Sequence, residues 1–328
     1  MSPVAVPASE GREVDVFTFG EVMALLRADD GLPLAHAGSF RRDVAGAEGN
    51  VAIGLARLGH RVHLVLRLGR DAFGAAVAAT FRAEGVRLTV IEDPDRPTGL
   101  LLRDVLDSRP ITVVYHRAGS AASALAPADL DLERVGRARV LHVSGITPVL
   151  GTSAAGATLA AVTEARRAGT LVTFDPNLRP SVASAEVAVA RWLPLLDQTD
   201  VLLASADEAE VMVASRDPRT VARWFHARGV AVVVVKDGAR GAWASDGDEI
   251  VLAPARPVHA VDPVGAGDAF AAGFISALLD GGDLRAALDS ATVVAASAVQ
   301  FAGDTAGLPS RAERDALLRD GSHAEVRR

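Results

Sequence analysis

The segment VDPVGAGDAFAAGF, residues 261–274, places two closely spaced glycines immediately before a long apolar run. Gly265 and Gly267 allow the backbone to turn tightly and leave the amides on either side of Ala266 unobstructed. The apolar run up to Leu279 is expected to form a buried helix whose positive end points at this turn. The segment therefore predicts an anion hole built from Gly265, Ala266 and Gly267.

The carboxyl group of Asp268 directly follows this turn, where its charge would repel a bound anion. One explanation is structural, because aspartate is among the best N-cap residues of helices. The other is chemical, because a turn that stabilises a transferring phosphoryl group can hold a general base beside it. The spacing alone slightly favours the helix cap.

Two common phosphate-binding motifs do not fit the sequence. Phe270 stands where a dinucleotide-binding loop needs its third glycine, and Gly20 at the end of the first expected strand is followed by Glu21. The chain also has no Gly-Lys pair, which a Walker A loop requires. A nicotinamide-dependent dehydrogenase therefore ranks last, and a kinase here would use backbone amides and arginines to bind phosphates.

The composition of the 328 residues, 49% hydrophobic and 23% charged, is typical of a globular protein. The net charge of −7 argues against nucleic-acid binding, which needs cations facing phosphates. The absence of cysteine excludes disulfides, thiolate metal sites and a cysteine nucleophile. The first residues lack a signal-peptide pattern and no apolar run is long enough to span a bilayer, so we expect a cytoplasmic protein without a membrane partner.

Short apolar runs alternate with stretches of helical periodicity, which predicts βα units and a parallel sheet. The expected strands are Val14–Phe19, Val62–Leu66, Val140–Val143, Leu171–Phe174, Val201–Leu203 and Val230–Val235. The expected helices are Val51–Leu58, Phe73–Glu84, Thr152–Arg167, Ala209–Ala214, Thr220–Ala227 and Leu284–Gln300, besides the one after the glycine turn. The fold class is α/β: a doubly wound, mostly parallel sheet with helices on both faces and a ligand crevice at the carboxyl ends of its strands.

Three strand-like segments, Val22–Arg27, Gly99–Val105 and Ile111–His116, break this alternation because no crossover helices join them, and DSRP at 107–110 is typical of a turn. We expect them to form a small β-sheet lid that excludes water from the crevice. The predicted large domain comprises residues 14–21, 46–97 and 118–320, the lid comprises 22–45 and 98–117, and the termini at 1–13 and 321–328 are expected to be flexible.

Two segments in this order resemble the signatures of the ribokinase-like (PfkB) carbohydrate kinases: AGAEGNVAIGLARLG at 45–59, and DPVGAGD at 262–268, which matches DTxGAGD. The likeness extends over most of the chain and is greatest to 2-keto-3-deoxygluconate kinases. It implies ATP-dependent transfer of phosphate to the C6 hydroxyl of a sugar acid, giving 2-keto-3-deoxy-6-phosphogluconate, with Asp268 as the catalytic base.

The resemblance also assigns substrate-binding residues. The turn Gly46-Ala47-Glu48-Gly49-Asn50 resembles the family's sugar-binding turn, and YHRAGSAAS resembles a lid strand in which Tyr115 and Arg117 contact the substrate. FDPNLRP at 174–180 implies that Arg179 lies between substrate carboxylate and nucleotide phosphate, and AGDTAGLPSR at 302–311 implies that Asp304 lies near the sugar. A sugar acid needs such local cations in an acidic protein.

On the nucleotide side, the resemblance implies that Asn177, Arg179 and Ser205 contact ATP, together with Lys236, Gly238, Arg240, Gly241 and Thr292. Glu208 would help to hold Mg²⁺ through water, since Mg²⁺ keeps several of its waters. The family also allows a K⁺ ion bound by carbonyl groups near Asp262, Val264 and Gly303. A homo-oligomer formed through the lid is a further implication.

Each of these residues also has a purely structural interpretation. Arg117 could be a solvated face of a strand, Tyr115 lid packing, Asn50 a helix N-cap, and Glu48 a first-turn charge. For each residue taken singly, the structural interpretation is favoured. The two family signatures in the expected order favour the functional interpretation instead.

The alternatives left open are another ribokinase-like kinase, acting on fructose, ribose or 5-dehydro-2-deoxygluconate, and a non-catalytic sugar or nucleotide sensor. The intact GAGD argues against the sensor. Ser205 for the family's Asn, Pro263 for Thr, and Leu101 for a sugar-contacting Tyr leave fine specificity open.

Overall fold

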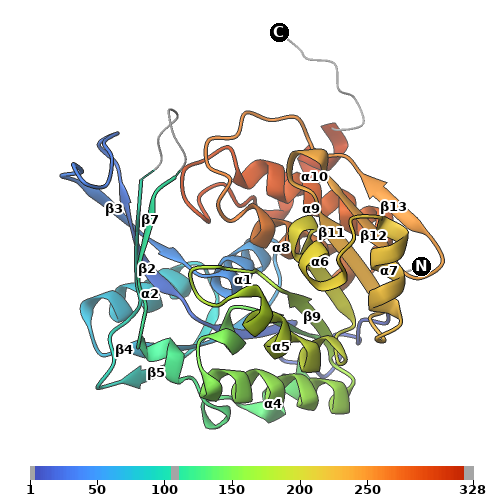
Figure 1. Cartoon of the computed structure of the whole chain (residues 1–328), viewed down its shortest axis with the longest axis horizontal. Helices are drawn as coiled ribbons and strands as arrows, with labels where there is room; N and C mark the ends of the chain where they lie inside the picture. The colour runs from blue at the N-terminus through green and yellow to red at the C-terminus, as the bar shows by residue number, and fades with distance from the viewer. Residues whose placement is uncertain (1–3, 105–110, 321–328) are drawn as a thin grey trace.

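Valine-rich strands form the centre of the molecule. The computed structural model, which describes residues 4–104 and 111–320, contains a nine-stranded sheet in the order β13-β12-β11-β10-β9-β8-β1-β4-β5 (Figure 1). The parallel strands are β1 (Val16–Gly20), β4 (Val62–Gly69), β5 (Arg87–Asp93), β8 (Val140–Ser144), β9 (Leu171–Asp175), β10 (Val201–Ser205) and β11 (Val232–Lys236); β12 (Ala242–Ser245) and β13 (Ile250–Ala253) are antiparallel.

Helices cover both faces of this sheet, as the sequence predicts. One face carries α1 (Ala47–Arg57), α2 (Ala72–Ala83), α8 (Ala266–Leu279) and α9 (Leu284–Ala298), with α10 (Arg311–Asp320) against α9. The other carries α3 (Leu132–Arg137), α4 (Thr152–Ala168), α5 (Ala185–Leu196), α6 (Ala206–Val213) and α7 (Pro218–His226). No helix within the described residues is long and apolar enough to cross a membrane.

The order of the strands reverses between β1 and β8. From β1 the chain proceeds outward to β4 and β5, and it then returns to β8 and proceeds outward the other way to β9, β10 and β11. In such sheets the ligand crevice lies at the carboxyl ends of the strands near the reversal. The residues that end those strands are polar or glycine: Gly20, Ser144, Asp175, Ser205 and Lys236.

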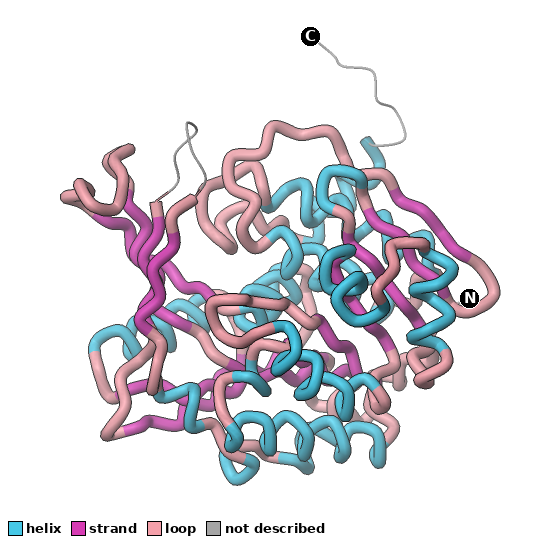
Figure 2. The backbone as a smooth tube through the Cα atoms, in the orientation of Figure 1, coloured by secondary structure: helices cyan, strands magenta, loops and turns pink. Residues whose placement is uncertain are grey.

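A second, smaller sheet stands beside the carboxyl ends of the large one, and we call it the lid sheet (Figure 2). Its order is β3 (Phe40–Ala45), β2 (Met23–Ala28), β6 (Leu100–Arg103) and β7 (Val113–His116). Strand β2 pairs parallel with β6 and antiparallel with β3, and β6 pairs antiparallel with β7. The three expected lid strands are present: the first is shifted by one residue, and the other two have shorter bounds. Val105, the turn at 107–110 and the terminal residues 1–3 and 321–328 lie outside the described residues.

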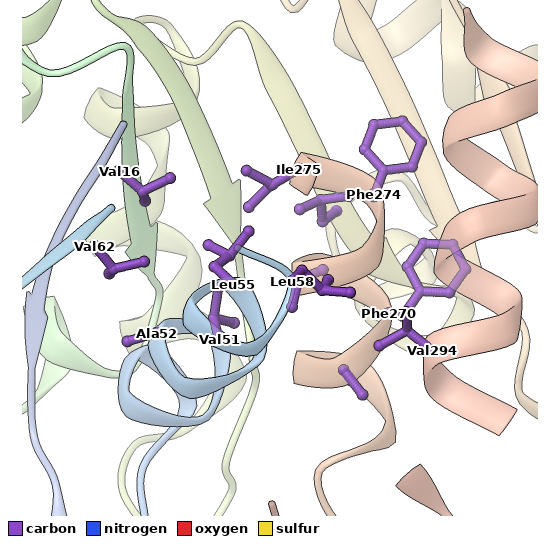
Figure 3. Packing of buried hydrophobic residues seen from close by; sticks show 14 of the residues in the cluster. Val16, Val51, Ala52, Leu55, Leu58, Val62, Phe270, Phe274, Ile275 and Val294 are labelled. Atoms are coloured by element: carbon purple, nitrogen blue, oxygen red, sulfur yellow. The ribbon is translucent and has the colours of Figure 1, made fainter. Parts of the chain in front are cut away.

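Helix α8 is held against the large sheet by close packing with α1 and α9. Figure 3 shows Leu55 of α1 and Leu58, which directly follows α1, beside Phe274 and Ile275 of α8. A Cβ atom at Gly54 would lie 2.7 Å from the Cβ atom of Ala272, so glycine is needed for α1 to approach α8 this closely. The position of the glycine turn at the start of α8 is therefore fixed by the core.

The sequence missed several elements at the periphery, namely β3, β5, β12, β13, α3 and α5. Helix α5 contains Pro194, and β3 carries the polar residues Arg41, Arg42 and Asp43, so neither shows a clean apolar period. The predictions succeeded where a strand is apolar on both faces, because both faces of the large sheet are covered.

Candidate functional site

The glycine turn has the geometry that its sequence predicts. Gly265 adopts a left-handed φ of +81° and is the N-cap of α8, and a Cβ atom there would lie 2.7 Å from the Asp304 carbonyl oxygen. The amide of Ala266 makes a long 3.3 Å bond to the Pro263 carbonyl, and the first amides of a helix have no intrahelical acceptor. The positive end of α8 is therefore available to an anion.

Asp268 is the third residue of α8, so the prediction that it caps the helix is wrong. Its carboxylate is buried and accepts a 2.8 Å hydrogen bond from Nδ2 of Asn50. The same Nδ2 donates a 3.3 Å bond to Asp304. Asn50 lies inside α1 rather than at its N-cap, so the capping interpretation of Asn50 is wrong too.

Burial dominates the electrostatics of both carboxyl groups. It raises the pKa of Asp268 from 3.8 to about 6, against the lowering effects of the Asn50 hydrogen bond and of the Arg179 and Lys236 charges. Burial also raises the pKa of Asp304 to about 6, although Arg103 lowers it. Acids tuned to such values are suited to accept a proton near neutral pH.

A cavity of about 600 Å³ opens in front of the turn, between the carboxyl ends of the strands and the lid sheet. Of the residues assigned from the sequence, it is lined by Tyr115, Asn177, Arg179, Ser205, Glu208, Lys236, Gly238, Gly265, Gly267, Asp268 and Asp304. Leu101 and Arg103 of the lid, with Pro263 and Val264, also line it. The cavity thus joins several carboxylates, three cations and a helix N-terminus.

A second cavity of about 490 Å³ adjoins the first and shares Lys236, Gly238, Pro263 and Gly267 with it. Its walls are largely apolar and include Gly241, Ala266, Phe270, Thr292, Ala296 and Val299. A flat, apolar group would fit here with its polar end toward the glycine turn.

The turn at 46–50 stands behind the cavity and does not line it. The Glu48 carboxylate is buried, where burial raises its pKa, and it accepts hydrogen bonds from Ser144 Oγ at 2.7 Å and Thr147 Oγ1 at 2.5 Å. A Cβ atom at Gly46 would lie 2.3 Å from the Glu21 carbonyl oxygen. From this turn, Asn50 reaches the site through its bond to Asp268.

Two of the assigned arginines do not line either cavity. Arg117 forms an ion pair with Glu21, and its guanidinium carbon lies 5.6 Å from the centre of the Tyr115 ring. Arg240 is exposed and pairs with Asp237 at 2.5 Å. Arg179, by contrast, lines the main cavity and donates to Asn177, which adopts a left-handed φ of +48°.

Glu208 and Ser205 form a reciprocal cap at the start of α6. Ser205 Oγ accepts from the Glu208 amide, and Glu208 Oε2 accepts from the Ser205 amide at 2.7 Å. Glu208 Oε1 also accepts from the Leu178 amide at 2.7 Å. Both oxygens of this cavity-lining carboxylate are thus already hydrogen-bonded, and the described residues contain no cluster of three or more acidic or histidine side chains suited to a metal.

Sequence reasoning missed three ion pairs at the site, made by Lys236 and Arg103. Lys236 Nζ lies 2.5 Å from Asp175 Oδ2, and burial raises the pKa of Asp175 to about 7 despite the lysine charge. Arg103 contacts both Asp262 and Asp304 at 2.8 Å. The alternation of strand β6 could have indicated Arg103, because it shares a face with the cavity-lining Leu101.

Comparison with known proteins defines the family. Residues 14–311 match the family model described as pfkB family carbohydrate kinase. Over 93% of this chain and 96% of its own length, 2-dehydro-3-deoxygluconokinase of Bacillus subtilis is 35% identical. The 2-dehydro-3-deoxygalactonokinase of Haloferax volcanii is 32% identical over 94% of this chain and 97% of its own. The chain belongs to the pfkB family of carbohydrate kinases and is a sugar kinase.

Solved structures agree with this assignment. The 2-dehydro-3-deoxygluconokinase of Thermotoga maritima has a TM-score of 0.86 at 27% identity, covering 93% of this chain and 98% of that one. An E. coli protein named as a candidate ribokinase II, solved in complex with ATP and Mg²⁺, has a TM-score of 0.86 at 25% identity, covering 93% and 99%. The fold is ribokinase-like, as the sequence indicated.

Replacing Asp268 with Asn is expected to lower kcat by ~10²–10⁴-fold, because the amide cannot accept the proton of the sugar hydroxyl. Steady-state kinetics, with circular dichroism as the check on folding, measures this. Asp289→Asn, on the later helix α9, is the matched control and should keep wild-type turnover. Wild-type turnover in Asp268→Asn itself would remove Asp268 from the role of base.

The pH profile of kcat/KM should fall below about pH 6, because the raised pKa leaves a growing fraction of Asp268 protonated. Asn50→Ala removes a hydrogen bond that favours the ionised form, so the acid limb should move up by about one pH unit. Asp304 shares Asn50, so this limb belongs to the pair. Gln300→Ala, an exposed amide, should leave the profile unchanged, and an unmoved limb in Asn50→Ala would contradict the coupling.

Proposed function

We propose that this sugar kinase transfers phosphate from ATP to the C6 hydroxyl of 2-keto-3-deoxygluconate, giving 2-keto-3-deoxy-6-phosphogluconate and ADP. The observation that carries the proposal is the position of Asp268 at the wall of a cavity that also contains Arg179 and the positive end of α8. A base, a cation and free amides at one point are the requirements of phosphoryl transfer to a hydroxyl.

The sugar acid is proposed to lie between the lid sheet and the Asp268–Asp304 pair. Tyr115 and Leu101 supply an apolar wall, and Asn50 Oδ1, buried without a hydrogen-bond partner among the described residues, can accept from a sugar hydroxyl. Arg179 receives the carboxylate end. Arg117 assists if its guanidinium, which has five donors, keeps Glu21 on one edge and turns another toward the substrate.

The nucleotide is proposed to occupy the second cavity, with its base against the apolar wall that includes Thr292 and its phosphates over Gly238 and Gly241. Lys236 lines both cavities, so it can contact the phosphates between them. Arg240 faces solvent next to this turn and would contribute only at the rim.

Magnesium fits Glu208 only through water. Two backbone amides hold the carboxylate at the cavity wall, which orients it but gives few direct ligands. That donor set suits an ion that keeps most of its waters. When bound with ATP, Mg²⁺ would neutralise phosphate charge.

The chemical step then depends on the residues of the chain. Asp268 accepts the proton of the C6 hydroxyl as its oxygen attacks the γ-phosphorus and the bond to the β-phosphate oxygen breaks. The turn amides of Gly265, Ala266 and Gly267 stabilise the developing negative charge, and Arg179 neutralises it further. The lid sheet excludes water, which would otherwise accept the phosphoryl group.

The closest alternative substrate is the C4 epimer, 2-keto-3-deoxygalactonate, because the Haloferax volcanii relative is named for that activity. The two sugar acids place the same carboxylate and terminal hydroxyl in the site. A neutral sugar is less favoured, since it gives the cavity arginine no carboxylate to bind.

The edges of the lid sheet support a homo-oligomer as a further part of the proposal. Phe40 on edge strand β3 and Val113 and Val114 on edge strand β7 are exposed. Exposed apolar edge strands pair readily with another copy.

A substrate panel tests the proposed function. ADP release with ATP and Mg²⁺ should give the highest kcat/KM for 2-keto-3-deoxygluconate among that acid, its C4 epimer, 5-dehydro-2-deoxygluconate, gluconate, fructose and ribose. Preference for fructose or ribose would overturn the carboxylate roles of Arg117 and Arg179. If no sugar of the panel stimulates ADP release, the result would favour a non-catalytic sugar or nucleotide sensor.

Arg179→Ala should raise KM for the sugar acid by about 10–100-fold, because a charged hydrogen-bond partner of the carboxylate is lost. KM for any neutral sugar that the enzyme accepts should change much less. Arg191→Ala, on helix α5, provides the control. Equal increases for both kinds of sugar would show that Arg179 does not recognise a carboxylate.

A further inference from the structure

Arg103 is one of the largest fully buried side chains of the described structure, with 1% of its surface exposed. It is the last residue of β6 in the lid sheet, yet both of its partners belong to the other side of the cavity. Its NH2 group lies 2.8 Å from Asp262 Oδ2 and 2.8 Å from Asp304 Oδ1, and NH1 lies 3.4 Å from Asp262 Oδ1. A buried cation thus crosses from the lid to the glycine turn.

Asp262 in turn binds the backbone of the two loops that shape the anion hole, at Val264 and Gly303. Its Oδ1 accepts from the Val264 amide at 3.1 Å, and its Oδ2 accepts from the Gly303 amide at 3.0 Å. The carboxylate is completely buried, so without Arg103 its charge would have no ion-pair partner among the described residues. Displacing Arg103 would therefore disturb the turn directly before Gly265.

Asp304 connects Arg103 to the proposed base, Asp268, through a shared hydrogen-bond donor. It shares the Nδ2 group of Asn50 with Asp268, at 3.3 Å and 2.8 Å respectively. The backbone of Asp304 also packs against Gly265, where a Cβ atom would clash with its carbonyl oxygen. Arg103 is thus connected to the anion hole through Asp262. Through Asp304 it is connected to Asn50, which donates a hydrogen bond to Asp268.

We propose that Arg103 is a positioning residue that couples the lid sheet to the catalytic turn. Its two ion pairs form only while β6 lies over the cavity, so the turn amides and Asp268 are held in place when the lid is in place. The proposal uses the kinase activity of the family but not the identity of the sugar.

The same contacts fix the charge at Asp262. Both carboxylate oxygens accept from a backbone amide and from the guanidinium, so Arg103 supplies a fixed positive charge at this position.

Kinetics of three variants provide the first test, using whichever sugar of the panel the wild-type enzyme converts fastest. Arg103→Gln should lower kcat by about 10²-fold with a smaller change in KM for ATP, because the base and the amides are displaced rather than removed. Arg103→Lys, which keeps the charge but not the fork, should lose about tenfold. Arg42→Gln, an exposed arginine on the opposite face of the lid sheet, is the matched control and should retain wild-type rates.

The chain contains one tyrosine, Tyr115, and it lies in the lid at the cavity wall, which gives a readout that does not need turnover. Protein labelled with 3-fluorotyrosine should show one ¹⁹F resonance. In the wild type and in Arg42→Gln, addition of ADP, Mg²⁺ and sugar should move it to a single sharp position. In Arg103→Gln it should stay broad or near its ligand-free position.

If Arg103→Gln fails to fold, the double variant Arg103→Gln/Asp262→Asn removes the unpaired buried charge, and Arg103→Lys still decides the question. Wild-type kcat together with a wild-type ¹⁹F response in any folded Arg103 variant without the guanidinium fork would overturn the proposal. A protein inactive on every sugar but showing the expected ¹⁹F difference would contradict only the proposed function.

Chemical rescue tests whether the charge of Arg103 is needed at Asp262. Guanidinium ions at millimolar concentration should partly restore the turnover of Arg103→Ala. An Arg103→Ala enzyme that guanidinium does not restore would contradict the view that Arg103 supplies the charge at Asp262.

Discussion

The arrangement of this site depends on the burial of three carboxyl groups, Asp262, Asp268 and Asp304, around one glycine turn. Burying like charges together is unfavourable, so each must be offset. Asp262 is offset by Arg103 and two backbone amides, and Asp304 by Arg103 and Asn50. Asp268 has the Asn50 hydrogen bond and more distant cations. Burial nevertheless raises the pKa of both Asp268 and Asp304 to about 6, so both can take up a proton near neutral pH, and Asp268 is the one that lies on the first turn of α8.

The large sheet supplies the surroundings of these carboxyl groups. Its strands β9, β10 and β11 end in Asp175, Ser205 and Lys236 at the carboxyl edge of the sheet, and α8 directs its N-terminus to the same cavity. Phosphoryl transfer requires mainly positioning and electrostatic stabilisation, and both come here from backbone and strand ends that the core fixes. Close packing of α1 on α8 at Gly54 keeps Asn50 and Asp268 within hydrogen-bond distance.

The lid sheet contributes two arginines with different surroundings. Arg117 pairs with Glu21 where the chain passes from β1 to β2, and Arg103 pairs with the carboxylates beneath the glycine turn. Substrate recognition by Arg117 and the packing of the lid sheet against the glycine turn by Arg103 can therefore depend on separate residues.

The sequence by itself determined the alternating α/β architecture, the anion-binding turn at 265–267 and the family, because these rest on periodicity and on residues adjacent in the chain. It also indicated most of the residues that line the main cavity. Only the tertiary structure decided that Asp268 and Asn50 are not helix caps, that Glu48 and Arg117 turn to buried partners, and that Arg103 reaches Asp262. Those outcomes depend on contacts between segments 96 to 218 residues apart. The sequence does not show whether such a side chain will cap its own helix or bind a distant partner. Packing of α1, α8 and the lid sheet selects between them.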